Sequence, residues 1–559
     1  MAGISAARLR TIFALFAVLS IVLSARVVYW QAVARGELLE RARGQVVSDE
    51  VLPAQRGTIR DRGGAILAAT VELRSLYAIP SRIKDKPATA ASLGVLLGRD
   101  SGPILQRLTA GAEWVFIQRR LPETAAEAIA KLSIAGLGFI KEPKRLYPNE
   151  DLAAHALGFV NDEGLGQGGV EGWYDDVLRG ENGTLVVDRD PADRSIAVGL
   201  REAVAPRHGA DVTLTIDLVV QTSAERELRA AIERERAASG AIVIIDPRDG
   251  AIRAMASYPT FHPASVAAAD PASMRDRSIA MPYEPGSVMK AVTMAAGIDT
   301  GVVTPNTTYE DRGYADIGGR RLLNALGRAW GPTTMTQVLE RSANAGAVFV
   351  GSKLGGQRLS DAIRAFGFGA RTGVDLAGEA SGVVRPLAEW YPVDVGTAAF
   401  GQGLTATPLQ LAAAYAAIAN GGVLVRPYVV ASWRDADGEH RTAPAATRRV
   451  VSAGTASTLR DMLVSAVDNG LAQGARIPGF SVAGKTGTAQ IPSPDGRYVD
   501  DEYISTFAGF FPAADPSFVT VIVLERPKSK LLGTVSAMST FRAVAQDTLR
   551  YARIQPDRR

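Results

Sequence analysis

The hydrophobic pattern begins with a long apolar segment near the N-terminus. Residues 11–34 carry a single charge, Arg26, and include the aromatic pair Tyr29 and Trp30. This pattern is typical of one membrane-spanning helix, because Arg26 can reach the interface, where aromatic rings also gather. Two arginines in residues 1–10 favour a cytoplasmic tail and an extracytoplasmic bulk. The sequence therefore predicts a single-pass protein of the cell (inner) membrane.

A cleaved signal peptide is the alternative interpretation of this segment, with residues 23–25 near the cut. We favour a retained anchor because the apolar character resumes after Arg26. No second stretch of the sequence approaches membrane length.

The remaining pattern predicts two domains. Short strand-like pieces and Gly-rich turns fill residues 45–207, with a helical section over residues 89–133. A second domain is predicted over residues 211–555. It opens with a hairpin pattern over residues 241–256 and closes with a strand pair over residues 504–524, with helices between. This order predicts an α+β fold in which the first and last strands share a central antiparallel sheet flanked by helices.

Composition narrows the class of protein. The chain has 559 residues, 47% hydrophobic and 21% charged, and no Cys, which excludes a disordered chain, a disulfide scaffold and a Cys-ligated metal site. The net charge of +4 has no long basic run behind it and does not suggest nucleic-acid binding. The four histidines lack metal-ligand spacing, so we expect no metal site.

Residues 285–290 carry the first candidate chemistry. Pro and Gly precede a helical pattern over residues 288–298 that is apolar nearly all round and therefore buried. Ser287 stands in its first turn, and Lys290 follows three residues later on the same face. Burial lowers the pKa of a lysine, so Lys290 can accept the hydroxyl proton of Ser287 and activate it as a nucleophile.

Two further motifs follow in the same predicted domain. Ser342 and Asn344 come from one short stretch after a helical pattern, and a strand-like stretch then carries Lys485, Thr486, Gly487 and Thr488. The patterns S-x-x-K, S-x-N and K-T-G in this order are the signature of penicillin-binding proteins and serine β-lactamases.

Lysine usage supports two of these motifs. The chain contains 10 Lys and 52 Arg, and only Lys290, Lys353 and Lys485 lie between residues 145 and 527. Arginine stays charged in proteins and cannot act as a neutral base. A chemical requirement therefore explains Lys290, and we extend it to Lys485, whereas Lys353 needs no special explanation.

Further motifs extend the likeness along the chain, and they lie at residues 56–68 (RGTIRDRGGAILA), 145–148 (RLYP) with His155, 169–172 (GVEG), 373–376 (GVDL) and 400–403 (FGQG). With these motifs the chain resembles the class B penicillin-binding proteins, the monofunctional transpeptidases of bacterial peptidoglycan synthesis. The resemblance implies an anchor over residues 11–34, a pedestal domain of the dimerisation type over residues 45–207, and a transpeptidase domain over residues 211–555.

The resemblance also implies a role for each site residue. Ser287 would attack the penultimate D-Ala of a stem peptide with Lys290 as base, and Ser342 would relay a proton to the leaving amine. The substrate would be held by Asn344, Lys485, Thr486, Gly487 and Thr488. β-Lactams would inhibit the enzyme by acylating Ser287, and no cofactor is implied.

The partners that the resemblance implies are stem peptides, their lipid-linked precursor polymer, and a polytopic SEDS-type glycosyltransferase contacted through the anchor and the pedestal. Asn344 favours the septal branch, because elongation-type relatives commonly carry Asp at this position. Three alternatives stay open: an elongation-type transpeptidase, a D,D-carboxypeptidase or β-lactamase, and a non-catalytic β-lactam sensor or division scaffold.

Overall fold

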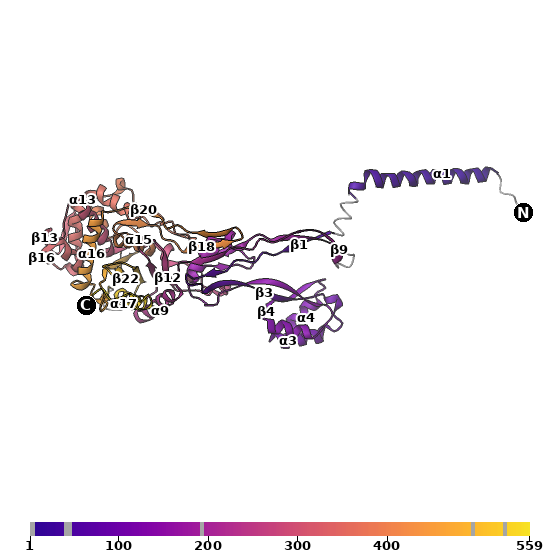
Figure 1. Cartoon of the computed structure of the whole chain (residues 1–559), viewed down its shortest axis with the longest axis horizontal. Coiled ribbons are helices and arrows are strands. Elements are labelled where there is room, and N and C mark those ends of the chain that lie inside the picture. The colour runs from indigo at the N-terminus through magenta and orange to yellow at the C-terminus, as the bar shows by residue number, and fades with distance from the viewer. Residues whose placement is uncertain (1–5, 38–46, 190–194, 494–497, 529–533, 559) are drawn as a thin grey trace. The chain divides into compact units, whose positions relative to one another are not determined.

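The computed structural model describes residues 6–37, 47–189, 195–493, 498–528 and 534–558 (Figure 1). The chain divides into two compact units. Residues 1–55 and 180–209 form the first unit, and residues 56–179 and 210–559 form the second.

The first unit contains the apolar helix that the sequence predicts. Helix α1 (Ala6–Val28) continues as a π-helical turn over Tyr29–Val33, and its side chains are exposed along the whole length. At 1.5 Å per residue, these 28 residues extend over about 42 Å, more than the hydrocarbon thickness of a bilayer. The same unit holds an antiparallel sheet in the order β1-β8-β9, formed by Val47–Leu52, Gly183–Arg189 and Ser195–Val204.

The second unit opens with a small α+β layer. Its long strand β3 (Ile66–Ala78) pairs with β4 (Val115–Leu121) and β5 (Leu137–Leu146). Leu76, Leu93, Leu108, Ile117 and Ile129 are buried in the core that this sheet shares with three helices, α3 (Lys86–Leu97), α4 (Ser101–Thr109) and α5 (Glu123–Lys131).

The helical section predicted over residues 89–133 is wrong in its middle. Strand β4 interrupts it, because Ile117 and Leu121 face the core while the neighbouring Arg119 and Arg120 do not. Pairing with β3 fixes this stretch as a strand, and such long-range pairing leaves no helical period to detect.

A five-stranded antiparallel sheet lies at the centre of the C-terminal part, in the order β12-β11-β23-β22-β21. Its strands are β11 (Ser239–Ile245), β12 (Ile252–Tyr258), β21 (Ala483–Pro492), β22 (Tyr498–Phe511) and β23 (Phe518–Glu525). Ile242 of β11 stands opposite Ile522 of β23, so the first and last strands share one sheet as predicted.

Both faces of this sheet are covered. Ile242 and Ile244 pack with α9 (Leu218–Glu235) and α17 (Thr534–Tyr551), whereas Val243 and Ile245 belong to the core on the other face. Strands that are buried on two sides read as continuous apolar runs, which explains the sequence AIVII at residues 241–245. The predicted α+β fold is confirmed.

The opposite face carries the helices that build the site. Helix α15 (Pro408–Ala419), which is buried over residues 408–418, packs against the sheet. The other helices on this face are α10 (Arg277–Ala280), α11 (Lys290–Asp299), α12 (Met335–Arg341), α13 (Asn344–Ala365), α14 (Pro392–Ala399) and α16 (Ala453–Asp468). Within the described residues of the C-terminal part, three short strand pairs lie outside the main sheet: β13 (Thr308–Asp311) with β16 (Gly331–Thr334), β14 (Tyr314–Ile317) with β15 (Arg320–Leu323), and β17 (Val423–Val425) with β20 (Ala446–Arg449).

A second sheet joins the two parts of this unit. Strand β10 (Asp211–Leu214) pairs in parallel with β2 (Ile59–Arg60) and antiparallel with β18 (Val430–Asp435), which in turn pairs with β19 (Gly438–Arg441). The strand order β19-β18-β10-β2-β3-β4 therefore runs from the C-terminal part into residues 56–179 without a break.

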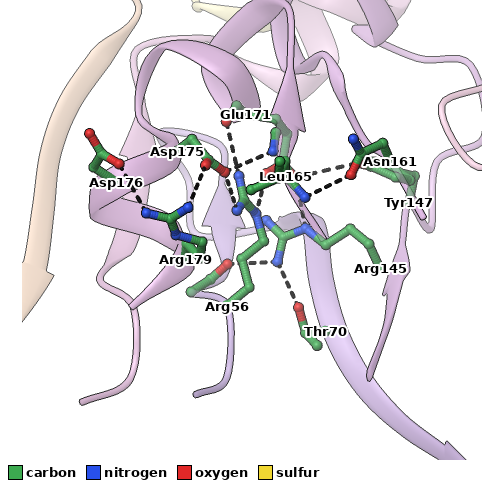
Figure 2. A network of polar contacts seen from close by, with 12 residues as sticks. Arg56, Thr70, Arg145, Tyr147, Asn161, Leu165, Glu171, Asp175, Asp176 and Arg179 are labelled. Atoms are coloured by element: carbon green, nitrogen blue, oxygen red, sulfur yellow. Dashed lines mark hydrogen bonds and ion pairs between the residues drawn. The ribbon is translucent and has the colours of Figure 1, made fainter. Parts of the chain in front are cut away.

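A buried ion cluster lies beside this sheet, and Figure 2 shows its contacts. The fully buried carboxylate of Glu171, in α7 (Gly169–Trp173), accepts hydrogen bonds from Arg56 Nε and Arg145 Nε, each at 2.7 Å. Arg145 also donates to the carbonyl oxygen of Gly57, and Arg56 pairs with Asp175 in α8 (Asp175–Arg179) at 2.6 Å. The cluster thus ties the family motifs at residues 56–68, 145–148 and 169–172 together.

Candidate active site

Ser287 lies in a single 3-10 turn, Gly286–Met289, that leads directly into α11. Gly286 has a φ of +60°, and a Cβ atom there would lie 2.8 Å from the carbonyl oxygen of Thr488. Only glycine fits this conformation so close to a strand. The turn is held from beneath by the buried Tyr415, whose hydroxyl donates to the carbonyl oxygen of Val288 at 2.9 Å.

Lys290 is buried next to the serine, with 1% of its surface exposed. Its Nζ lies 3.0 Å from Ser287 Oγ, 2.6 Å from the carbonyl oxygen of Ser342, 3.3 Å from Ser342 Oγ and 2.7 Å from Asn344 Oδ1. No carboxylate belongs to this set. Burial holds the pKa of Lys290 well below its usual value, and repulsion by Lys485 lowers it further. A neutral amine is therefore accessible at moderate pH, as the general base requires.

Ser342 stands between the two lysines in a left-handed conformation with a φ of 55°. It ends α12, whose start is fixed by a capping box between Thr334 and Gln337. A non-glycine residue in this region costs about 1 kcal/mol, and such strain gathers at functional sites. The geometry places Ser342 Oγ within 2.9 Å of Lys485 Nζ and 3.3 Å of Lys290 Nζ, so one hydroxyl bridges both amines.

Lys485 lies on β21 and is also 1% exposed. Besides Ser342 Oγ, its Nζ contacts the carbonyl oxygen and the Oγ1 of Thr486, at 3.1 and 3.3 Å. Burial lowers the pKa of Lys485 to about 7. A cation that is poorly solvated in this way gains most when an anion such as a substrate carboxylate arrives.

Strand β21 runs close to the serine turn. A Cβ atom on Gly487 would lie 3.1 Å from the carbonyl oxygen of Pro285 and from Val288 Cγ1. Thr486 is buried, whereas Thr488 is exposed on the strand. Residues 486 and 488 share one face of β21, so neighbouring groups cover that face at Thr486 and leave it open at Thr488, while Gly487 allows the close approach to the serine turn.

Asn344 is the first residue of α13 and contacts both the base and a loop. Its Oδ1 accepts from Lys290, and its Nδ2 donates to the carbonyl oxygen of Leu323 at 2.9 Å. The loop is fixed by Asn324, which accepts from Ala345 N–H at 2.9 Å and donates to the buried Asp311. Asn324 supports the start of α13 beside Asn344 but belongs to no sequence motif, so the sequence alone does not reveal its role.

The structure brings the predicted residues into one site. Ser287, Lys290, Ser342, Asn344 and Lys485 form a continuous chain of hydrogen bonds, and residues 486–488 lie beside it on β21. The buried Tyr283, which no sequence motif indicates, contacts Thr506 Oγ1 at 3.0 Å, and Thr506 stands opposite Gly487 in the sheet. Among the residues that the structure describes, no group of three His, Asp or Glu side chains suits a metal ion.

A serine in contact with a buried lysine whose pKa is held low, with a second buried lysine nearby, is the arrangement of a serine acyltransferase. Comparison with known families agrees. Residues 240–546 match the penicillin-binding protein transpeptidase domain, and residues 51–214 match the penicillin-binding protein dimerisation domain. The chain belongs to the class B penicillin-binding proteins, as the sequence predicts.

Individual relatives cover nearly all of the chain. Stage V sporulation protein D of Bacillus subtilis is 33% identical over 548 residues, which are 95% of this chain and 84% of the relative. Peptidoglycan D,D-transpeptidase FtsI of Escherichia coli is 30% identical over 95% of this chain and 90% of its own. The crystal structure of penicillin-binding protein 3 from Mycobacterium tuberculosis, complexed with aztreonam, is 30% identical with a TM-score of 0.71 and covers 91% of this chain and 98% of that one.

Proposed function

We propose that the chain is a serine D,D-transpeptidase that cross-links peptidoglycan stem peptides through an acyl-enzyme on Ser287. The observation that carries the proposal is the 3.0 Å contact between Ser287 Oγ and the buried amine of Lys290, whose pKa is held low. The Escherichia coli relative is a peptidoglycan D,D-transpeptidase by name, which supplies the substrate class.

In the acylation step, Lys290 Nζ takes the proton from Ser287 Oγ as the oxygen attacks the carbonyl carbon of the penultimate D-Ala. The negative charge on the carbonyl oxygen is stabilised by the backbone N–H groups of Ser287 and Thr488, a contribution commonly worth about 3 kcal/mol. Ser342 relays the proton from Lys290 to the leaving nitrogen, which its contacts with both lysines support. The C–N bond then breaks, and terminal D-Ala leaves as an amine.

The remaining site residues hold the donor peptide. Asn344 binds a peptide amide, and Lys485 with Thr486 and Thr488 binds the terminal carboxylate, to which a buried cation is attracted strongly. Gly487 lets β21 lie against the serine turn. In the second step an amine from a neighbouring stem peptide attacks the ester carbon, gives up its proton to Lys290, and releases Ser287.

The same serine is the proposed target of β-lactams. A structure with aztreonam exists for the Mycobacterium tuberculosis relative, and the residues that would form the ester are present here. The test is labelling of membranes with a fluorescent penicillin. Wild type is expected to become labelled and Ser287→Ala to stay unlabelled, and equal labelling of both would contradict the assignment of the nucleophile.

The lifetime of the label separates the alternatives. A transpeptidase keeps the penicilloyl ester for many minutes, whereas a β-lactamase hydrolyses it within seconds. A label that survives while a D-Ala-D-Ala peptide is only hydrolysed, with no amine product, would indicate a carboxypeptidase or a sensor instead.

The domain boundaries and the location belong to the same proposal. Residues 1–10 form a cytoplasmic tail, residues 11–34 an anchor in the cell membrane, residues 45–207 the pedestal and residues 211–555 the transpeptidase domain. Support comes from the apolar helix α1 and from the two family matches. Protease added outside intact spheroplasts should degrade the large domain while an epitope at the N-terminus stays protected.

A septal role and a SEDS-type glycosyltransferase partner complete the proposal. The septal role is supported by Asn344 in the middle motif, and one relative is a named sporulation protein. Depletion of the protein is expected to give filamentous cells, whereas rounded cells would indicate an elongation role. Crosslinking through residues 11–34 should capture a polytopic glycosyltransferase that binds the lipid-linked precursor polymer.

A further inference from the structure

The loop of residues 323–330 lies directly beside the proposed donor site. Asn344 Nδ2 donates to the carbonyl oxygen of Leu323 at 2.9 Å, and Asn324 Oδ1 accepts from Ala345 N–H at 2.9 Å. Asn324 also donates to the carbonyl oxygen of Arg328 at 2.9 Å. The start of the loop is therefore attached to the start of α13, where Asn344 contacts Lys290, and Asn324 also holds Arg328 farther along the loop.

This loop is strained and open to solvent. Leu326 has a φ of 58° and is 90% exposed. Neither the backbone preference of leucine nor burial of its side chain therefore explains this conformation. The left-handed region costs a branched residue about 1–2 kcal/mol. Strain of this kind persists at ligand contacts, where the surrounding structure holds it in place.

Two arginines share one aromatic ring at the end of the loop. The guanidinium carbon of Arg328 lies 4.1 Å from the centre of the Trp330 ring, and that of Arg341 lies 4.9 Å from it. Arg341 directly precedes Ser342 in the sequence and donates a hydrogen bond to Thr333 Oγ1 at 3.1 Å. Two like charges are thus gathered at the edge of the catalytic site.

These two arginines differ from their neighbour Arg321. Arg321 stacks on Tyr314 at 4.0 Å and forms an ion pair with Asp316 at 2.9 Å. Within the part of the chain that the structure describes, no carboxylate lies within ion-pair distance of Arg328 or Arg341. Two guanidinium groups against one ring repel each other, and an anion that contacts both would remove this repulsion.

We propose that Arg328 and Arg341, held against Trp330, bind a carboxylate of the donor stem peptide upstream of its D-Ala-D-Ala end. This inference rests on the proposed function. The terminal carboxylate is assigned to Lys485, so a second cationic site would bind a second anionic group of the substrate. Because the loop is attached to Asn344, which would hold the donor backbone, the anion belongs to the same peptide rather than to a distant phosphate. The Arg328–Arg341 pair is therefore a specificity site for acidic donors.

A matched pair of penicillins tests this inference on the full-length enzyme. Carbenicillin differs from benzylpenicillin by one carboxylate on the side chain, and that side chain occupies the place of the peptide that precedes D-Ala-D-Ala. The measured quantity is the ratio of the two second-order acylation rate constants, at constant ionic strength because exposed charges are screened by salt.

The ratio of carbenicillin to benzylpenicillin is expected to fall about fivefold in Arg328→Gln and in Arg341→Gln, since one exposed charge contact is worth about 1 kcal/mol. Arg320→Gln removes one positive charge from strand β15, which leads into the loop, without touching Trp330, and should keep the wild-type ratio. Arg328 and Arg320 are both exposed, so neither change endangers folding. A thermal melt confirms this for each variant.

Three outcomes would overturn the inference. An unchanged ratio in both Trp330-contacting variants excludes a carboxylate at this site. An equal fall of this ratio in Arg320→Gln would show that it responds to the overall surface charge and not to a contact beside Trp330. If inorganic pyrophosphate slows the acylation of wild type but not that of Arg328→Gln, the site binds a phosphate group instead. Failure of wild type to react with either penicillin would instead contradict the proposed function, so the two failures are distinguishable.

Discussion

Lys290 and Lys485 are the two large cationic side chains at the centre of the site, and each is 1% exposed. Burial lowers both pKa values, that of Lys485 to about 7. Below pH 7 the folded protein must keep Lys485 charged in its interior, while the unfolded chain solvates it freely. The full destabilisation by the buried charge of Lys485 is therefore present below pH 7. It is lost as the pH rises from about 7 towards 10.5, the pKa of this lysine in the unfolded chain.

The Lys485→Met substitution is accordingly expected to stabilise the protein while it weakens acylation. The melting temperature should rise by about 2–4 °C at pH 6, because an apolar side chain of similar length replaces a buried charge. At pH 10 the gain should be much smaller. Scanning calorimetry at both pH values checks this, and a melting temperature below wild type at pH 6 would contradict it.

Lys290→Arg tests the need for a neutral base. Arginine keeps the positive charge but does not release its proton, so acylation by a fluorescent penicillin should slow by about 10³-fold. Lys353→Arg is the matched control. Lys353 is exposed on α13, with its amine 5.0 Å from the Phe349 ring, and this variant should react like wild type. Normal acylation by Lys290→Arg would mean that another group takes the proton.

The pH dependence of acylation follows from the same two groups. The rate constant for the free enzyme should rise with pH as Lys290 loses its proton, and should fall as Lys485 loses its proton with a pKa of about 7. Stopped-flow acylation between pH 5 and 9 should give a bell-shaped profile. Lys485→Met should lose the descending limb, and a profile that keeps rising in wild type would show that Lys485 is not needed as a cation.

At the scale of single elements, the sequence predicted best what is encoded locally. The three catalytic motifs and the hairpin over residues 241–256 each depend on neighbours in the chain, and Asp217 caps α9 as its pattern predicts. Strand β4 and the supporting role of Asn324 depend on partners more than 20 residues away. Neither leaves a periodic pattern, so neither could be predicted from sequence alone.

The buried cluster of Arg56, Arg145 and Glu171 makes α7 dependent on two distant segments. The Glu171→Gln substitution would leave two buried guanidinium groups without their carboxylate, and we expect the free energy of unfolding to fall by about 3–5 kcal/mol. Asp176→Asn removes an exposed partner of Arg179 and should cost less than about 1 kcal/mol. Urea unfolding followed by circular dichroism compares the two, and equal effects would contradict the importance of burial.

At the scale of the whole molecule, the sequence predicted an anchor and two domains but not which distant segments pack together. The change of pattern predicts a boundary near residue 210, and the dimerisation-domain match ends at residue 214, before the transpeptidase match begins at residue 240. The compact units divide the chain differently, because residues 56–179 belong with the C-terminal part and residues 180–209 return to the N-terminal unit. Strand pairing between β1 and β8, over 130 residues apart, decides this and has no local signal.

A half-buried carboxylate also joins the two parts of the second unit. Glu225 on α9 accepts the N–H of Ala153 at 2.7 Å and is contacted by Gln221, and burial raises its pKa to about 7. Since the folded protein binds a proton that the unfolded chain has lost, stability falls as the pH rises from about 4.5 to 7.

Glu225→Gln is therefore expected to be more stable than wild type by about 2 kcal/mol at pH 8, with no gain at pH 4.5. The amide oxygen of glutamine can still accept the Ala153 N–H. Glu233→Gln, on the same helix, serves as the control and should show no such pH dependence. Thermal melts across this range make the comparison, and a constant difference between Glu225→Gln and wild type would exclude the ionisation of Glu225 as its cause.

The parallel pairing of β2 with β10 has a consequence for isolating the catalytic part. A polypeptide that started at residue 211 would leave one edge of β10 bare, with the N–H and C=O groups that normally face Ile59 and Arg60 open to any other strand. Unpaired edges recruit further chains, so such a fragment should form aggregates or swapped dimers. Polypeptides made for inhibitor screening and crystallisation should therefore begin at residue 56 or earlier, so that they include β2, which pairs with β10.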